Sequence, residues 1–413
     1  MTDMVYINDK VYAISHNNAP NAKVVATSLQ HPDWANPATI VAENSRWIVR
    51  GLSYCKDFLI IVYSNGITGR ASTYSFKTKT ISTIKLPFPG TVGIQCIDHN
   101  SNNCDLHMTS WNKPGTEYNY DAGTGIFTPG SFNKPAVYPA AYNDLELEEV
   151  EVKGHDGVMI PLTIIYRKGI KKDGSNVCLM EGYGAYGIGQ FPKFDDHLNS
   201  LAVRGVVIAI THIRGGGEKG EAWHKGGFKT TKQNTWKDFV SSAEYLIAGG
   251  YTSPQRLAGM GTSAGGILIS RAVTERPDLF AAAICNVGCA NAMRMEFTAN
   301  GPENMAELGT VKDSVECKAL YEMDGVQHVV AGTAYPAVIC VGEWNDPRVM
   351  PWQPGKFAAV LQNASTSGKP VLLKVNYNSG HFTEDKDVYY ADFANQYAFI
   401  LWQCGHPDFQ QKN

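Results

Sequence analysis

The sequence predicts two folded parts, an antiparallel β domain over residues 1–140 and an α/β domain over residues 141–413. The first part contains short β-rich runs separated by turns rich in Gly, Asn and Pro. The second part alternates apolar, strand-like runs with segments of helical periodicity. A chain of 413 residues is also longer than one ordinary hydrophobic core supports, which favours two domains.

Strand–turn–strand pairs repeat along the N-terminal part. The expected strands are VYAIS at 11–15, FLIIVYS at 58–64, ASTYSF at 71–76, DLHMTSW at 105–111 and TEYNY at 116–120. When Tyr12, Ile60 and His107 are taken as equivalent, the period is about 47 residues, which is typical of a four-stranded propeller blade. An ordinary antiparallel sheet whose hairpins look alike is the alternative interpretation.

Three blades are fewer than the four to eight of a typical closed propeller. Such a set leaves strand edges open and an apolar face uncovered. We therefore expect a partial, propeller-blade-like domain. Either the set of blades is truncated, or it packs on the second domain or on another chain. A homo-oligomer formed through the exposed sheet edges is one arrangement that this would allow.

Strands and helices alternate in the C-terminal part. The expected strands are VCLMEGYG at 177–184, VVIAIT at 206–211, RLAGMG at 256–261, PAVICVGE at 336–343 and VLLKVNY at 371–377. Helical segments follow at about 234–247, 264–276 and 387–403. This alternation predicts a parallel sheet covered by helices on both faces.

The segment GTSAG at 261–265 fits the pattern G-x-S-x-G, directly between a predicted strand and a predicted helix. A serine on such a sharp turn needs small neighbours, because the strand and the helix crowd together there. This context predicts an α/β-hydrolase domain with Ser263 as the nucleophile. It also leaves the backbone N–H of Ala264 at the helix N-terminus, where it can donate to an oxyanion. A glycine-rich loop with a spectator serine is the alternative.

A serine hydroxyl needs a general base, and in this fold the acid and the histidine follow the serine on loops after later strands. Asp346 and His381 occupy such positions. We therefore predict that His381 takes the proton of the nucleophile and that Asp346 orients the imidazole. Glu343 is the alternative acid, and His328 and His406 are alternative histidines that lack a preceding strand.

Composition and charge exclude several classes of function. The net charge of −3 provides no basic field that would attract nucleic acid or an anionic membrane. The longest apolar runs, such as 206–210 and 281–285, are far shorter than a bilayer span. The first ten residues include acidic side chains and no apolar stretch of a secretion signal, so we expect a cytoplasmic location.

The nine cysteines are scattered without the spacing of metal ligands. Cys285 and Cys289 are the closest pair, and no cluster of histidines or cysteines accompanies them. A metal or redox site at this pair is the alternative to buried free thiols in a reducing compartment. We expect free thiols, with no metal and no organic cofactor.

From about residue 150 to its end, the chain resembles the prolyl oligopeptidase family of serine peptidases. The segments that carry the resemblance are EGYGAYG (181–187), ITHIRGGGEKGEAWHKGG (210–227), KQNTWKDFVSSAEYLIAGGYTSPQRL (232–257), GTSAGG (261–266), NDPRVMP (345–351) and SGHF (379–382). Residues 1–140 resemble, more weakly, the last blades of the family's seven-bladed propeller. The resemblance implies the same triad of Ser263, Asp346 and His381. It also implies that the Tyr183 hydroxyl joins the oxyanion hole and that Arg348 binds a substrate carbonyl.

The chain departs from the family pattern in three places. Less than half of the propeller that covers the family's active site is present. Asn304 stands near the position of the tryptophan that stacks on the substrate proline, and GTSAGG replaces the usual GGSNGG. A shortened cap and a missing proline platform favour easily cleaved substrates.

We therefore expect a serine hydrolase that cleaves small or aromatic acyl esters through an acyl-enzyme, with residual cleavage of short peptides. The first alternative is a prolyl oligopeptidase-type peptidase that cleaves short peptides after proline. The second is an inactive binding or scaffold protein.

Overall fold

The computed structural model describes residues 3–130, 137–383 and 385–410, and its contacts divide the chain into two compact units. Unit 1 comprises residues 1–140 together with 191–195 and 218–222, and unit 2 comprises 141–190, 196–217 and 223–413. The two short later segments are not part of the predicted N-terminal domain. Within unit 1, the Thr91 hydroxyl donates to the Pro192 carbonyl at 2.6 Å. This hydrogen bond connects the segment 191–195 to the N-terminal part of the unit.

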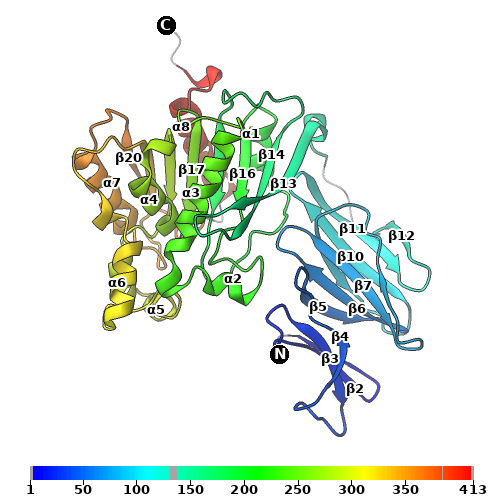
Figure 1. Ribbon diagram of the computed structural model, residues 1–413. Helices are drawn as coiled ribbons and strands as arrows, with labels where there is room; N and C mark the ends of the chain where they lie inside the picture. Colours follow the sequence, from blue (N-terminus) through cyan, green and yellow to red (C-terminus); the bar gives the residue numbers. More distant parts are fainter. Residues whose placement is uncertain (1–2, 131–136, 384, 411–413) are drawn as a thin grey trace. The chain divides into compact units, whose positions relative to one another are not determined.

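Three four-stranded antiparallel sheets follow one another in the described part of unit 1 (Figure 1). The first has β1 (Met4–Ile7), β2 (Lys10–Ser15), β3 (Lys23–Ser28) and β4 (Ala38–Val41). The second has β5 (Ile48–Tyr54), β6 (Phe58–Ser64), β7 (Gly69–Ser75) and β8 (Ile81–Thr83). The third has β9 (Thr91–Gln95), β10 (Asn103–Ser110), β11 (Lys113–Asp121) and β12 (Ile126–Pro129). Tyr12, Ile60 and His107 each lie on the second strand of a sheet, so the predicted blade-like repeat is confirmed.

The middle sheet of unit 1 packs on both of its neighbours. Successive side chains of a strand point to opposite faces, and β6 uses both faces. Leu59 and Ile61 join the apolar cluster that contains Tyr12 of the first sheet. Ile60, between them, joins the cluster that contains Leu106 of the third sheet. The continuous apolar run of β6 is therefore explained by burial on two sides.

The cysteines differ from expectation in one pair. Cys96 and Cys104 form a disulfide, and the Cys55 thiol lies in the same sulfur cluster. Cys96 directly follows β9 and Cys104 lies on β10, and the pairing of Gln95 with Asp105 places the two cysteines opposite each other. The prediction of free thiols throughout is thus wrong for this pair, because a hairpin brings together cysteines whose spacing matches no motif. Among the described residues, the other seven cysteines are free.

Within its described residues, unit 2 has an eight-stranded sheet in the order β13-β14-β16-β15-β17-β18-β19-β20. Its strands are β13 (Leu145–Lys153), β14 (Met159–Arg167), β15 (Cys178–Gly182), β16 (Val207–Thr211), β17 (Leu257–Thr262), β18 (Ala282–Asn286), β19 (Ala337–Glu343) and β20 (Val371–Asn376). The strands from β16 to β20 in this order pair in parallel, and β13 and β14 extend the sheet antiparallel. The carboxyl ends of the parallel strands consequently lie along one edge, where ligands of such sheets bind.

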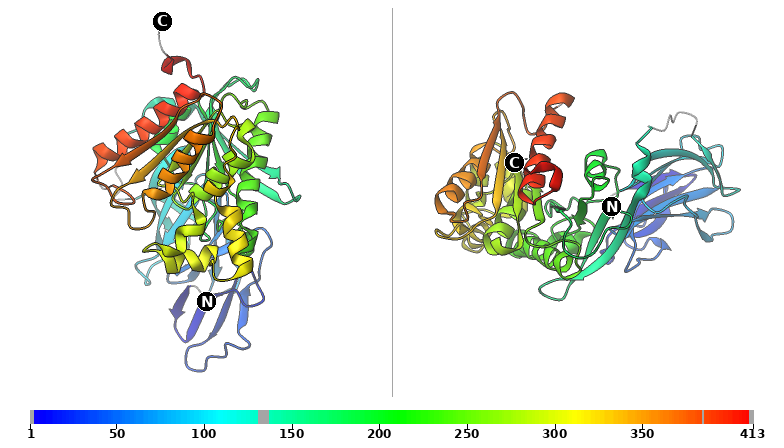
Figure 2. Two further views of the ribbon diagram at one scale, coloured as in Figure 1. Left: turned by 90° about the vertical axis from the view of Figure 1, so that its left-hand side faces the viewer. Right: turned by 90° about the horizontal axis from the view of Figure 1, so that it is seen from above.

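Helices cover both faces of this sheet (Figure 2). They are α1 (Asp196–Ala202), α2 (Glu221–Lys225), α3 (Gln233–Ala248), α4 (Gly265–Glu275), α5 (Gly301–Leu308), α6 (Ser314–Met323), α7 (Trp352–Ala364) and α8 (Lys386–Gln403). One apolar cluster joins three of these helices to the sheet. Phe239 of α3, Leu268 of α4 and Phe357 of α7 belong to it, together with buried residues of the strands. The predicted α/β-hydrolase architecture is confirmed. None of the described helices combines the length and apolarity needed to cross a bilayer.

Candidate active site

Ser263 lies in the turn between β17 and α4, with a backbone φ of +57°. This left-handed conformation is rare for a residue with a side chain and costs on the order of 1–3 kcal/mol. The turn is held by two backbone bonds: Ser263 N donates to Asn286 O, and Cys289 N donates to Ser263 O, each at 2.9 Å. The end of β18 and the loop that follows it therefore keep the strained serine in place.

The glycines around Ser263 are required by space. A Cβ at Gly261 would lie 2.0 Å from the carbonyl oxygen of Gly265, and a Cβ at Gly266 would lie 2.2 Å from the nitrogen of Cys289. Both distances are far shorter than any real contact, and both involve backbone atoms. The small residues of GTSAGG thus allow the strand, the helix and the next loop to meet.

The structure brings together the three predicted triad side chains, although they come from separate loops. His381 Nε2 lies 3.0 Å from Ser263 Oγ, and His381 Nδ1 lies 2.6 Å from Asp346 Oδ2. Asp346 is 2% exposed, and its Oδ1 accepts the backbone N–H groups of Arg348 (2.8 Å) and Val349 (2.9 Å). With both carboxylate oxygens engaged, Asp346 has one orientation from which to hold the imidazole.

The alternative acid and histidines make other bonds. Glu343 Oε1 accepts from Asn376 Nδ2 at 2.7 Å. His328 Nδ1 lies 2.8 Å from the Asp324 carbonyl, and His406 Nδ1 accepts the backbone N–H of Asp408 at 3.3 Å. Among these candidates in the described part of the chain, only Asp346 and His381 are connected to Ser263 by hydrogen bonds.

The backbone N–H of Ala264 and the hydroxyl of Tyr183 are the two predicted oxyanion donors at Ser263. The backbone N–H of Ala264 donates to no group among the described residues, and Ala264 precedes α4 at its N-terminus. Burial raises the pKa of Tyr183 to about 12, with Cys289 and Glu307 adding to the shift and Arg348 opposing it. The Tyr183 hydroxyl is therefore protonated at neutral pH and remains a hydrogen-bond donor.

A buried lysine that sequence reasoning missed supports the turn after Tyr183. Lys232 is 1% exposed, and its Nζ donates to the Gly184 carbonyl at 2.6 Å and lies 3.9 Å from Glu307 Oε1. Burial lowers the pKa of Lys232 to about 8, although Glu307 opposes this shift. The sequence signal was slight, since Lys232 merely begins one of the segments that resemble the family.

Asn304 and Arg348 have different surroundings. Asn304 is 3% exposed and accepts the Tyr186 hydroxyl at 2.9 Å, while its Nδ2 donates to the Met295 carbonyl at 3.1 Å. The Arg348 side chain is exposed and makes no ion pair with a described residue. Its charge nevertheless lowers the pKa of Tyr183, so it lies within electrostatic range of that hydroxyl.

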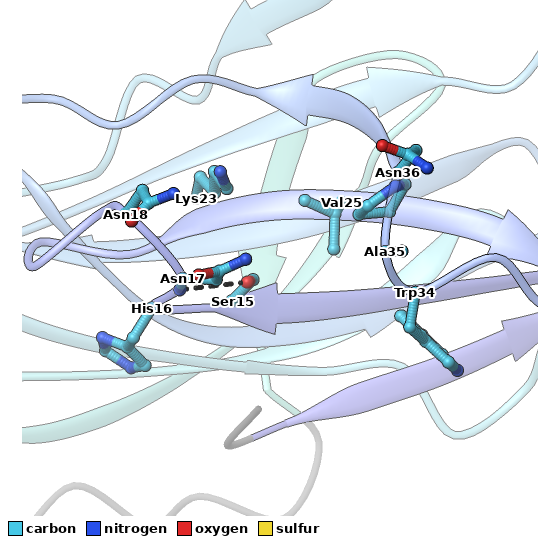
Figure 3. A pocket seen from close by; sticks show the side chains of 10 residues that line it. Ser15, His16, Asn17, Asn18, Lys23, Val25, Trp34, Ala35 and Asn36 are labelled. Carbon is cyan, nitrogen blue, oxygen red and sulfur yellow. Dashed lines mark hydrogen bonds between the residues drawn. The ribbon is translucent and has the colours of Figure 1, made fainter.

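A separate cavity of about 490 Å³ lies on unit 1, beside β2 and β3 (Figure 3). Its lining includes Ser15, His16, Lys23 and Trp34, and the Asn17 backbone N–H donates to the Ser15 hydroxyl at 3.3 Å. None of its lining residues is a predicted site residue. The predicted catalytic triad, by contrast, lies entirely in unit 2.

Two family models match the chain. The model described as "Prolyl oligopeptidase family" matches residues 192–407, and that described as "Prolyl oligopeptidase, N-terminal beta-propeller domain" matches residues 3–131. Among curated proteins, the chain is 30% identical over 399 residues to a prolyl endopeptidase of Elizabethkingia meningoseptica. It is 28% identical over 408 residues to a dual function macrocyclase-peptidase of Galerina marginata. These alignments cover 96% of this chain but 56% and 55% of the relatives, so the chain spans just over half of their length.

Solved structures show the same fold. A structure from a study of two prolyl endopeptidases superposes with a TM-score of 0.90 at 28% identity, covering 99% of this chain and 60% of that one. Prolyl oligopeptidase B from Galerina marginata, bound to a 35-residue substrate, gives a TM-score of 0.89 at 26% identity, with coverages of 98% and 58%.

These findings correct the expectation of an ester hydrolase. The relatives and the solved structures are named prolyl endopeptidases, oligopeptidases and macrocyclase-peptidases, and none of those cited is named an esterase. The error came from inferring the leaving group from a shortened cap and one missing aromatic residue. Neither feature reports on the chemistry at Ser263.

Proposed function

Because the chain belongs to the prolyl oligopeptidase family, we propose that it is a serine peptidase that cleaves short peptides on the carboxyl side of proline. The observation that carries the proposal is the continuous hydrogen-bonded series from Ser263 Oγ through His381 to Asp346. The names of the relatives supply the class of substrate.

In the first half-reaction, Ser263 Oγ attacks the carbonyl carbon of the scissile peptide bond while His381 Nε2 removes the hydroxyl proton. Asp346 stabilises the imidazolium that forms. The Ala264 N–H and the Tyr183 hydroxyl donate to the oxyanion. Each such donor typically lowers the activation free energy by a few kcal/mol.

The imidazolium then donates its proton to the nitrogen of the leaving group, the C–N bond breaks, and the acyl-enzyme remains on Ser263. In the second half-reaction His381 deprotonates a water molecule that attacks the ester carbonyl. The proton returns to Ser263 Oγ as the acid product leaves.

The test is turnover of a fluorogenic blocked Gly-Pro amide by the purified chain, compared with the matched Gly-Ala amide and with Ser263→Ala. We expect cleavage that prefers proline and that Ser263→Ala abolishes. Covalent labelling by a fluorophosphonate, lost in the same variant, distinguishes an active triad from an inactive scaffold. Labelling without cleavage of either peptide would refute the peptidase proposal.

A further inference from the structure

A small cavity of about 150 Å³ lies beside His381 at the carboxyl ends of β17, β18 and β19. Its lining includes Glu343, His381, Phe382, Asp392, Phe393 and Gln396. All of them belong to unit 2, and α8 supplies the last three. At about 30 Å³ for each water molecule, the volume is that of a side-chain end group with a short alkyl stem.

Two buried acceptors on the wall of this cavity are incompletely bonded. Glu343 and Gln396 are 6% and 1% exposed. Glu343 Oε1 accepts from Asn376, and Gln396 Nε2 donates to Asn286 Oδ1 at 3.3 Å. Glu343 Oε2 and Gln396 Oε1 accept no hydrogen bond of normal geometry from the described residues. Buried acceptors of this kind favour a ligand that brings donors.

The charges on the wall favour a cation. Asp392 also lines the cavity, but its carboxylate is already paired with the Lys374 ammonium and accepts from Asn376 Nδ2 at 2.8 Å. No lysine or arginine is among the described lining residues, so two carboxylates, Glu343 and Asp392, face the cavity with no cationic side chain on its wall. Burial and the nearby Asp392 raise the pKa of Glu343, which Asn376, Lys374 and Ser379 partly offset. Phe382 and Phe393 also line the cavity, and aromatic side chains can attract a cation.

The position relative to the triad indicates which part of a substrate would enter. The leaving group must depart toward His381, because the imidazolium protonates it. His381 lines the cavity, whereas the oxyanion candidates Ala264 and Tyr183 do not. A leaving group protonated by His381 would therefore lie next to this cavity.

We propose that this cavity binds the ammonium group of a lysine side chain located just after the scissile bond. A primary ammonium has three donors and one positive charge, which match Glu343 Oε2, Gln396 Oε1 and the anionic wall. The inference depends on the proposed peptidase function, and it adds a substrate preference on the side of the scissile bond opposite to proline.

The test compares two fluorogenic peptides that differ only in lysine or norleucine after the scissile bond. For the unmodified chain we expect kcat/KM to be about tenfold higher with lysine, the effect of one charge-assisted hydrogen bond. In Glu343→Gln, which keeps the acceptor for Asn376, the ratio should fall to about two or less. Glu244→Gln, on an exposed glutamate of α3, is the matched control and should keep the ratio. Equal rates for the two peptides with the unmodified chain, or an unchanged ratio in Glu343→Gln, would overturn the inference.

A binding measurement separates this inference from the proposed function. n-Butylammonium chloride should raise the Tm of the unmodified chain more than n-butanol in equimolar choline chloride does, and Glu343→Gln should lose the difference. If Glu343→Gln folds poorly, Gln396→Met provides the same comparison. Selective stabilisation without cleavage of any peptide would refute the peptidase but retain the cation site. If n-butylammonium raises the Tm of Glu343→Gln as much as that of the unmodified chain, the cation site itself is excluded.

Discussion

The sheets of unit 1 and the site of unit 2 are assembled over different distances along the chain. In unit 1, β10 pairs with β11 from Asn103 opposite Asp121 down to Ser110 opposite Lys113, all within one hairpin. In unit 2, Ser263 and His381 are separated by 118 residues and meet because parallel strands end at the same edge. Local hairpins leave a repeat in the sequence, whereas a site formed by crossover connections leaves only the order of its residues.

The two regions also differ in what they bury. The cluster between the second and third sheets of unit 1 consists of side chains such as Ile60, Leu106 and Met108. Unit 2 buries charged groups near its site, including Lys232, Asp346 and Glu343. Substitutions in unit 1 should therefore change stability, while those at the site of unit 2 should change activity or its response to pH.

The largest expected effect tests the triad. Asp346→Asn preserves the size of the side chain but presents an amide to His381, which favours the wrong imidazole tautomer. We expect kcat to fall by about 10⁴-fold with little change in the free energy of unfolding. Steady-state kinetics and urea titration measure both, with Asp313→Asn, an exposed helix cap, as control. A loss of activity below about tenfold would exclude Asp346 from the triad.

The next effect tests the core of unit 1. Leu106 is fully buried on β10, and Leu106→Ala should reduce the free energy of unfolding of unit 1 by about 2–5 kcal/mol, because the cavity left behind is not refilled. The variant should still be labelled at Ser263 in its folded fraction. Ile126→Ala, at a residue 59% exposed, should change stability by less than about 0.5 kcal/mol. Denaturant unfolding followed by circular dichroism distinguishes the two variants.

A smaller effect tests the oxyanion donors. Tyr183→Phe removes the hydroxyl that burial keeps protonated, and kcat should fall by about 10–10³-fold while KM changes little. Tyr377→Phe, at an exposed tyrosine, is the control and should retain activity. If KM rises and kcat is unchanged in Tyr183→Phe, the hydroxyl binds the ground state rather than the oxyanion.

The smallest effect concerns pH. Folding lowers the pKa of Lys232 from 10.5 to about 8, so between these values the unfolded chain binds more protons than the folded one. Stability contributed by this group therefore rises with pH over that interval. Relative to Lys232→Met, the unmodified chain should gain about 2 kcal/mol between about pH 7.5 and about pH 9.5. Lys237→Met, on α3, the helix that begins directly after Lys232, should show no such pH-dependent difference. A stability difference between Lys232→Met and the unmodified chain that stays constant with pH would contradict the buried charge.

Several features were predictable because their causes are local. The hairpin repeat follows from alternating side chains and turn residues, and G-x-S-x-G follows from crowding at a tight turn, as the close approach at Gly261 demonstrates. The order of serine, acid and histidine also made Asp346 and His381 the predicted acid and base, with Glu343, His328 and His406 as alternatives. A peptidase was predicted only as the first alternative to an esterase, because the leaving group is not encoded in any of these local patterns.

The sequence by itself determined the two-part architecture, the strand-to-helix turn at Ser263 and the candidate triad, since each depends on residues close together in the chain or on their order. Tertiary structure alone decided that Asp346 rather than Glu343 contacts the imidazole, that Lys232 holds the turn after Tyr183, and that Glu343 and Gln396 face a common cavity. These contacts join elements that are distant in sequence. Their geometry depends on how helices and strands pack, which no short pattern specifies.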